Sequence, residues 1–134
     1  MKQFLLLSLV FLCFISCSSN ESTDPNGTDG DNSQTQDPII GTWTLQKDNG
    51  FDVSECVARS TYVFGADNSF TFEEYKLENN QCTLSNSYNG EWTNNNDGTY
   101  HIRRHGYTSG ANGPITFENN NQNMIITKYT WLRK

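Results

Sequence analysis

The sequence predicts an all-β domain over residues 38–134, in which short antiparallel strands follow one another as a meander and fold into a sandwich or a closed barrel. Apolar and aromatic residues recur at alternate positions in short runs, which is the period of a half-buried strand. Clusters of Asn, Asp and Gly separate these runs at a spacing of about eight to twelve residues. No stretch has the helical period of about 3.6 residues.

Residues 1–16 have the features of an export signal. A basic residue precedes an apolar run over 4–15, which is shorter than the roughly twenty residues of a membrane-spanning helix. Ser16-Cys17 resembles the bacterial lipobox, in which a cysteine after a small residue is acylated and becomes the mature N-terminus, although Phe14 stands where leucine is usual. The alternative is an ordinary secretory leader that contains a cysteine. We expect a lipoprotein signal peptide, and a Cys17 that carries palmitate and anchors the protein in a membrane.

Residues 17–37 are expected to form a disordered acidic tether. The segment carries five acidic residues, no basic residue and no large apolar side chain, so it buries too little surface to offset the entropy of ordering. Twenty flexible residues span roughly 25 Å, enough to hold a domain clear of lipid headgroups. Ser18 follows the cysteine in place of the aspartate that commonly retains lipoproteins at the inner membrane, so we expect the outer membrane of the cell envelope.

The domain opens with a predicted strand over 39–46, in which alternation puts Trp43 on the inner face. A glycine two positions before the tryptophan leaves space for a bend or a neighbouring backbone. The same Gly-Thr-Trp-Thr pattern recurs as Gly-Glu-Trp-Thr from Gly90 to Thr93. We interpret the two motifs as equivalent places where a strand enters a barrel.

A hairpin is predicted around the turn at 65–68, because aromatic residues alternate on both sides of it. Its inward residues are Tyr62, Phe64, Phe70 and Phe72. In this hairpin, paired residue numbers sum to about 135, so Cys56 lies at the open end within a few residues of Cys82. Outside the cytoplasm two such cysteines form a disulfide, with free thiols and a metal site as the alternatives.

Further strands and turns alternate to the end of the sequence. Strands are expected at Cys82 and Leu84, through 88–92, at 99–104, at 115–117 and as one long strand over 124–133, with a loop at 106–113. Clusters of asparagine fall between them, at 79–80, 94–96 and 119–121. Asparagine tolerates left-handed backbone, so these clusters indicate turns.

Residues 38–134 resemble the small lipocalin-like lipoproteins of bacteria. The resemblance rests on the two Gly-x-Trp motifs, the aromatic hairpin and the final Arg133-Lys134. It implies a meander closed into a lipocalin-like β-barrel of about eight strands, with Gly41 and Trp43 on the barrel floor and Arg133 stacked across the tryptophan. Other lipocalin signatures and a C-terminal helix are missing, so this is a reduced barrel whose interior can be filled by side chains.

The densest charge cluster spans 101–105. On a strand, His101 and His105 point outward about 13 Å apart, too far to share one zinc ion. Arg104 points inward, where it either binds an anionic head group such as that of a fatty acid, or caps the core or stacks on an aromatic ring. Glu74 continues the inner face of the hairpin and either pairs with Arg104 or a ligand amine, or lies in water beyond a bulge.

Two functions are compatible with this sequence. The first is the carriage of a small apolar ligand outside the cytoplasm, and the second is a filled barrel whose rim loops, around 48–58 and 105–113, bind another envelope protein. The candidate ligand-lining residues are Trp43, Tyr62, Phe64, Phe70, Phe72, Glu74, Trp92, Arg104 and Phe117. Ten acidic and eight basic residues in 38–134 argue against a nucleic-acid partner. No catalytic, phosphate-binding or metal motif is recognisable, so we expect neither an enzyme nor a cofactor.

Overall fold

The computed structural model describes residues 36–134, so the predicted signal peptide, the lipidation site at Cys17 and most of the tether lie outside the described residues. The elements are β1 (Gly41–Asp48), β2 (Phe51–Asp52), the 3₁₀ turn η1 (Val57–Arg59), β3 (Thr61–Phe64), β4 (Ser69–Glu78), β5 (Gln81–Asn94), β6 (Thr99–Arg104), β7 (Ala111–Glu118), β8 (Asn123–Ile126) and β9 (Tyr129–Arg133). None of the helical structure within 36–134 is long and apolar enough to cross a membrane.

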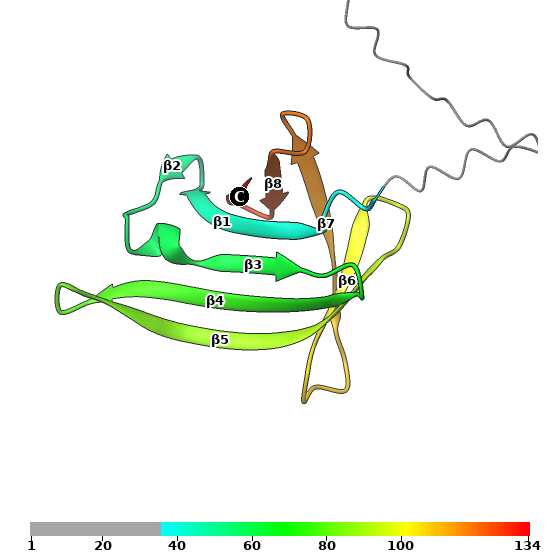
Figure 1. The fold of residues 1–134 in the computed structure, drawn as a ribbon, viewed down its shortest axis with the longest axis horizontal. Coiled ribbons are helices and arrows are strands. Elements are labelled where there is room, and N and C mark those ends of the chain that lie inside the picture. Colours follow the sequence, from blue (N-terminus) through cyan, green and yellow to red (C-terminus); the bar gives the residue numbers. More distant parts are fainter. Residues whose placement is uncertain (1–35) are drawn as a thin grey trace, which may run out of the picture. The chain divides into compact units, whose positions relative to one another are not determined.

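The strands close into one antiparallel barrel (Figure 1). From β3 to β9 each strand pairs with the next, β1 pairs with β3, and β9 pairs back onto β1 from Trp43↔Arg133 to Asp48↔Tyr129. The short β2 lies beside the end of β1 as a ninth strand. The predicted all-β fold, a lipocalin-like barrel of about eight strands, is confirmed.

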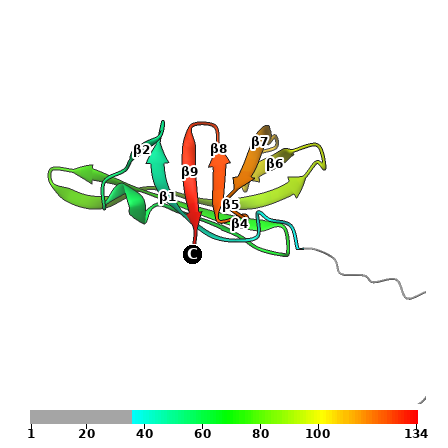
Figure 2. The ribbon, with the colours of Figure 1, turned by 90° about the horizontal axis from the view of Figure 1, so that it is seen from above.

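Because neighbouring strands run in opposite directions, the connections gather at two ends of the barrel (Figure 2). We call one end the floor; it holds residues 36–40 and the turns at 65–68, 95–98 and 119–122. The other end is the mouth, which holds the connections at 49–60, 79–80, 105–110 and 127–128. In Figure 2 the β8–β9 turn marks the mouth above and the C-terminal residue marks the floor below.

Left-handed backbone at the turns is supplied mainly by asparagine, as the sequence predicts. The asparagines with positive φ are Asn49, Asn68, Asn79, Asn80, Asn96, Asn119, Asn120 and Asn121. Thr127 is the exception, with φ of 56° in a turn that separates β8 from β9. The prediction of one strand over 124–133 is therefore wrong, because Thr127-Lys128 turns the chain without Gly, Pro or Asn. Likewise β7 begins at Ala111, inside the predicted loop.

The aromatic hairpin forms between β3 and β4 with Tyr62 opposite Phe72, so paired numbers sum to 134, one less than predicted. The predicted disulfide joins Cys56 to Cys82, with their α-carbons 5.4 Å apart. It ties the segment before η1 to the far part of the β4–β5 hairpin, which extends beyond β3 (Figure 1). The hairpin register predicted from the turn at 65–68 therefore placed the two cysteines correctly at the same end of the barrel.

The two Gly-x-Trp motifs are not equivalent. Gly41 opens β1 with φ of 138°, whereas Gly90 lies inside the long strand β5. A β-carbon on Gly90 would lie 2.1 Å from the carbonyl oxygen of Arg103 and 2.7 Å from the ring of Phe70. The second glycine therefore permits close strand packing in the barrel wall, and the interpretation of two matching entry points is wrong.

The half of the interior nearest the floor is filled mainly by large buried side chains. Its buried members include Ile39, Trp43, Phe64, Phe70, Trp92, Tyr100 and Met124. Trp43 donates its indole N–H to the carbonyl of Ile39, and Trp92 donates to that of Gly65. Asp37, which the sequence places in the tether, accepts a hydrogen bond from the Tyr100 hydroxyl at 2.9 Å and belongs to the floor.

Candidate functional site

Two cavities of similar volume open at the mouth, above the packed floor. The first has a volume of about 360 Å³ and the second about 350 Å³, within the range of roughly 300–1,000 Å³ typical of small-ligand sites. Tyr62, Ile126 and Thr127 line both, so the cavities meet at these residues. The first is further lined mainly by Leu45, Asp48, Val53, Val57, Phe72, Glu74, Lys76, Tyr129 and Trp131. The second is lined mainly by Phe64, Tyr88, Tyr100, Ile102, Arg104, Pro114 and Ile115.

Aromatic rings form the wall between the two cavities. The Tyr62 ring lies 4.4 Å from that of Phe72 and 4.8 Å from that of Trp131, measured between centroids. Its hydroxyl lies 3.4 Å from the hydroxyl of Tyr88. Burial, followed by this hydrogen bond, raises the pKa of Tyr62 well above its usual value. Tyr62 therefore stays neutral over the physiological range.

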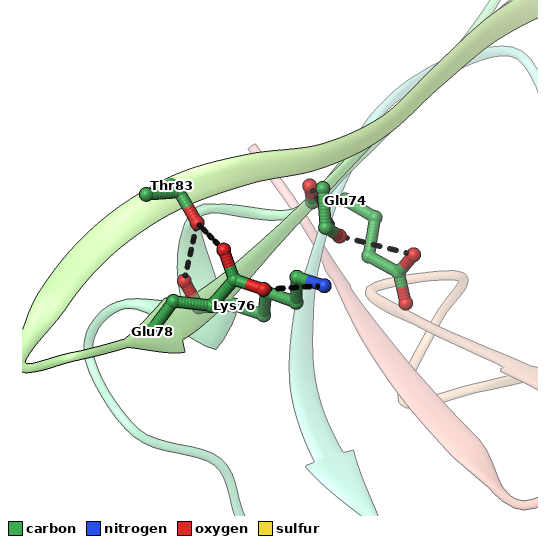
Figure 3. Close-up of polar contacts among 5 residues, drawn as sticks. Glu74, Lys76, Glu78 and Thr83 are labelled. Atoms are coloured by element: carbon green, nitrogen blue, oxygen red, sulfur yellow. Dashed lines mark hydrogen bonds and ion pairs between the residues drawn. The ribbon is translucent and has the colours of Figure 1, made fainter.

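The rim of the first cavity is acidic. The carboxylate of Asp48 pairs with Lys128 at 2.9 Å. Glu74 accepts a hydrogen bond from the Ser85 hydroxyl at 3.3 Å, just before the bulge that interrupts β4–β5 pairing. Lys76 pairs with Glu78 at 2.8 Å (Figure 3). The structure thus puts Glu74 at the mouth, on the first cavity and beside a bulge.

The rim of the second cavity is basic, because Arg104 lies there. Its guanidinium carbon is 3.6 Å from the centroid of the Tyr88 ring, in cation–π contact. Of the alternatives for Glu74, the pairing with Arg104 is not among the ion pairs within residues 36–134, and the two side chains line different cavities. Glu74 is exposed beside the bulge, as the alternative of a solvated carboxylate predicts. Glu74 and Arg104, the two charged residues that the sequence predicts to point inward, therefore lie at the rims of different cavities.

The barrel floor has the arrangement that the family resemblance implies for Gly41, Trp43 and Arg133. The guanidinium carbon of Arg133 lies 4.2 Å from the centroid of the Trp43 ring. The guanidinium also donates hydrogen bonds to the carbonyls of Ile40, Pro38 and Asn121. A β-carbon on Gly41 would lie 2.7 Å from Nη1 of Arg133, so the glycine makes room for the guanidinium.

Five of the nine candidate lining residues reach a cavity and four do not. Tyr62, Phe64, Phe72, Glu74 and Arg104 line the mouth. Trp43, Phe70, Trp92 and Phe117 line neither cavity and pack in or against the core. Alternation along a strand tells which face a side chain takes, but it does not tell how deep the residue lies along the barrel axis.

Several lining residues were not singled out from the sequence. Tyr88, which supports Arg104, shares its face of β5 with Gly90 and Trp92, so alternation alone was enough to find it. Val53 and Val57 belong to the connection between β2 and β3, and no periodicity marks a loop residue as buried. Ile126 reaches both cavities because β8 ends directly after it, at the missed turn.

The remaining members of the basic cluster are engaged on the outside of the barrel. Nδ1 of His101 lies 2.9 Å from the side-chain oxygen of Asn112. Glu91 pairs with Arg103, and Nε2 of His105 lies 3.8 Å from its carboxylate. This outward cluster is a local surface network and contributes no side chain to either cavity.

Comparison with protein families gives a match over most of the barrel. A family model described as a lipocalin-like domain matches residues 39–130, which cover β1 to β8 and the start of β9. No curated protein and no solved structure matches the sequence.

Proposed function

The chain belongs to the lipocalin-like domain family, and we propose that it binds or carries a small apolar ligand in the two cavities at the barrel mouth. The observation that carries the proposal is the contrast between the two halves of the interior. The floor half is filled mainly by large buried side chains, whereas two aromatic-lined spaces open toward the mouth, the second of which reaches down to Phe64 and Tyr100. Each space is larger than a few water molecules of about 30 Å³, and an open, mainly apolar cavity with a few polar groups at its rim is typical of ligand sites.

The proposed setting is the cell envelope, with the protein held by an acylated Cys17 and separated from the outer membrane by the acidic tether. The apolar run before Ser16-Cys17 supports this part. The chain enters the barrel at the floor, where Asp37 is hydrogen-bonded. The tether therefore joins the end opposite to the cavities. We propose binding without catalysis, since the titratable groups at the mouth form no recognisable catalytic set.

The experiment is a titration of the mature protein with the neutral fluorescent probe N-phenyl-1-naphthylamine. Ile126→Trp puts a large ring where the cavities meet and is expected to weaken probe binding at least tenfold. Ile125→Trp is the matched control, because Ile125 lies next along β8 and faces the other side of the sheet. Extra volume in a packed site typically costs about 1–3 kcal/mol of stability, so the urea midpoint of each variant is measured alongside.

Native mass spectrometry of protein purified from its host complements the titration. A bound small molecule that is lost from Ile126→Trp supports the proposal. Equal probe binding by both tryptophan variants, or no probe binding and no co-purified molecule in the wild type, would overturn it.

An interaction module is the second candidate, and the rim loops carry the observation that favours it. Phe51 is 78% exposed at the β1–β2 end of the mouth, and Tyr107 is 63% exposed in the β6–β7 connection. Both lie in the rim segments around 48–58 and 105–113 that the second function predicts as partner-binding, Phe51 in the short strand β2 and Tyr107 in a loop. Large exposed apolar side chains on loops are a common feature of protein interfaces.

A further inference from the structure

We propose that the ligand is an amphiphile with a single anionic group, and that Arg104 binds this group at the rim of the second cavity. The inference rests on the proposed function, because it names the ligand class and its orientation in the same site. It places the anion on the β6–β7 side of the mouth and the apolar body of the ligand beneath it.

The charges that line the two cavities differ in sign. The first cavity holds the carboxylates of Asp48 and Glu74 and the ammonium of Lys76, a net charge of −1. The second holds Arg104 as its one charged side chain among residues 36–134, a net charge of +1. A ligand with one negative group is therefore repelled from the first rim and attracted to the second.

Arg104 has no anionic partner in the described structure, whereas the neighbouring cations are paired. Lys76 is paired with Glu78, and Arg103 is paired with Glu91. Arg104 makes neither an ion pair nor a side-chain hydrogen bond to another residue within 36–134, and its one fixed contact is the face of Tyr88. That contact holds the guanidinium against the ring, and no side-chain hydrogen bond or ion pair within 36–134 occupies its N–H groups, which can therefore donate to a carboxylate.

The surroundings of Arg104 suit the rest of such a ligand. The Tyr88 ring under the guanidinium is linked through its hydroxyl to Tyr62, at the junction of the cavities. Phe64 and Ile115, which are both buried, supply apolar surface in the same cavity. A carboxylate at Arg104 thus remains in contact with water at the rim while a hydrocarbon body is buried, which avoids the cost of burying a charge.

The test compares three probes that share one hydrocarbon body and differ in the head group: decanoic acid, decan-1-ol and decylamine. Each displaces N-phenyl-1-naphthylamine from the full mature protein at pH 7.5, below its micelle concentration. The wild type is expected to bind decanoate about tenfold more tightly than decanol, because hydrogen bonds to a charged acceptor are about twice as strong as neutral ones. Decylamine is expected to bind most weakly.

Arg104→Gln and Arg103→Gln form a matched pair, since adjacent residues of β6 face opposite sides of the barrel wall. Arg104→Gln is expected to remove the preference for decanoate over decanol, mainly by weakening the binding of decanoate. Arg103→Gln is expected to keep the tenfold preference. Glu74→Gln, which removes a negative charge from the first rim, is expected to leave decanoate binding equal or tighter.

Three results would overturn the inference. They are equal binding of decanoate and decanol by the wild type, an equal loss of preference in both arginine variants, and weaker decanoate binding by Glu74→Gln. In the first two cases decanol still displaces the probe if the cavities bind apolar ligands, so the proposed function survives. If none of the three compounds displaces the probe, the ligand proposal itself fails.

Discussion

At the scale of single residues, Arg133 holds together several segments of the floor, and no sequence pattern predicts all of these contacts. Its guanidinium lies on Trp43 and donates to carbonyls from the segment before β1 and from the β7–β8 turn. The family resemblance implies that Arg133 stacks on Trp43. It does not imply the three carbonyl acceptors, because every residue has a backbone carbonyl and the residue type does not indicate which one accepts a hydrogen bond.

Arg133→Ala is expected to lower the free energy of unfolding by about 2–4 kcal/mol. The variant loses charge-assisted hydrogen bonds and a cation–π contact, and it leaves partly buried carbonyls without donors. Urea unfolding, followed by tryptophan fluorescence, measures the change. Arg103→Ala is the control, because an exposed ion pair contributes at most about 1 kcal/mol. Equal midpoints for the two variants would contradict this role for Arg133.

At the scale of elements, the disulfide fixes the segment between β2 and β3 against the β4–β5 hairpin. Val53 and Val57, on either side of Cys56, line the first cavity. This segment has one short 3₁₀ turn and no strand, and its backbone hydrogen bonds to β1 lie at its two ends, Val53 and Ser60. The covalent link therefore replaces the regular pairing that the segment lacks.

Reduction of Cys56–Cys82 is expected to lower the free energy of unfolding by about 3–4 kcal/mol, because the bond closes a loop of 26 residues. Urea unfolding with and without reductant measures this difference. A Cys56→Ser/Cys82→Ser double variant should have the lower stability under both conditions. A midpoint that reduction leaves unchanged, or two titratable thiols in the denatured mature protein, would rule out a structural disulfide.

The sequence predicted the elements with alternating aromatic residues well and those without them poorly. The β3–β4 register came within one residue because the turn at Asp67-Asn68 fixes it. The β8–β9 turn was missed because Thr127 adopts a left-handed conformation that its residue type does not favour. The cavities were not predictable, because they depend on depth along the barrel axis and on loop residues.

At the scale of the whole molecule, the described barrel and the anchor proposed at Cys17 are separate parts of the chain. Asp37 joins the floor, so the tether is shorter by this residue than the sequence suggests. Cys17→Ala is expected to move the protein from the membrane fraction to the soluble fraction, since the barrel then has no acyl chain to hold it. Fractionation of host cells followed by immunoblotting gives the readout, and continued membrane association would contradict the anchor.

The pairing of β1 with β9 affects the order in which the barrel can form. Every other neighbouring pair in the barrel wall joins strands that are close in sequence, whereas Trp43 and Arg133 are about ninety residues apart. During synthesis the meander can form strand by strand as a curved open sheet, but the ring stays open until β9 emerges. Until that moment β1 and the newest strand are unpaired edges, which are the surfaces through which chains pair with one another. The interval before closure is thus the period when the nascent chain is most exposed to misassembly.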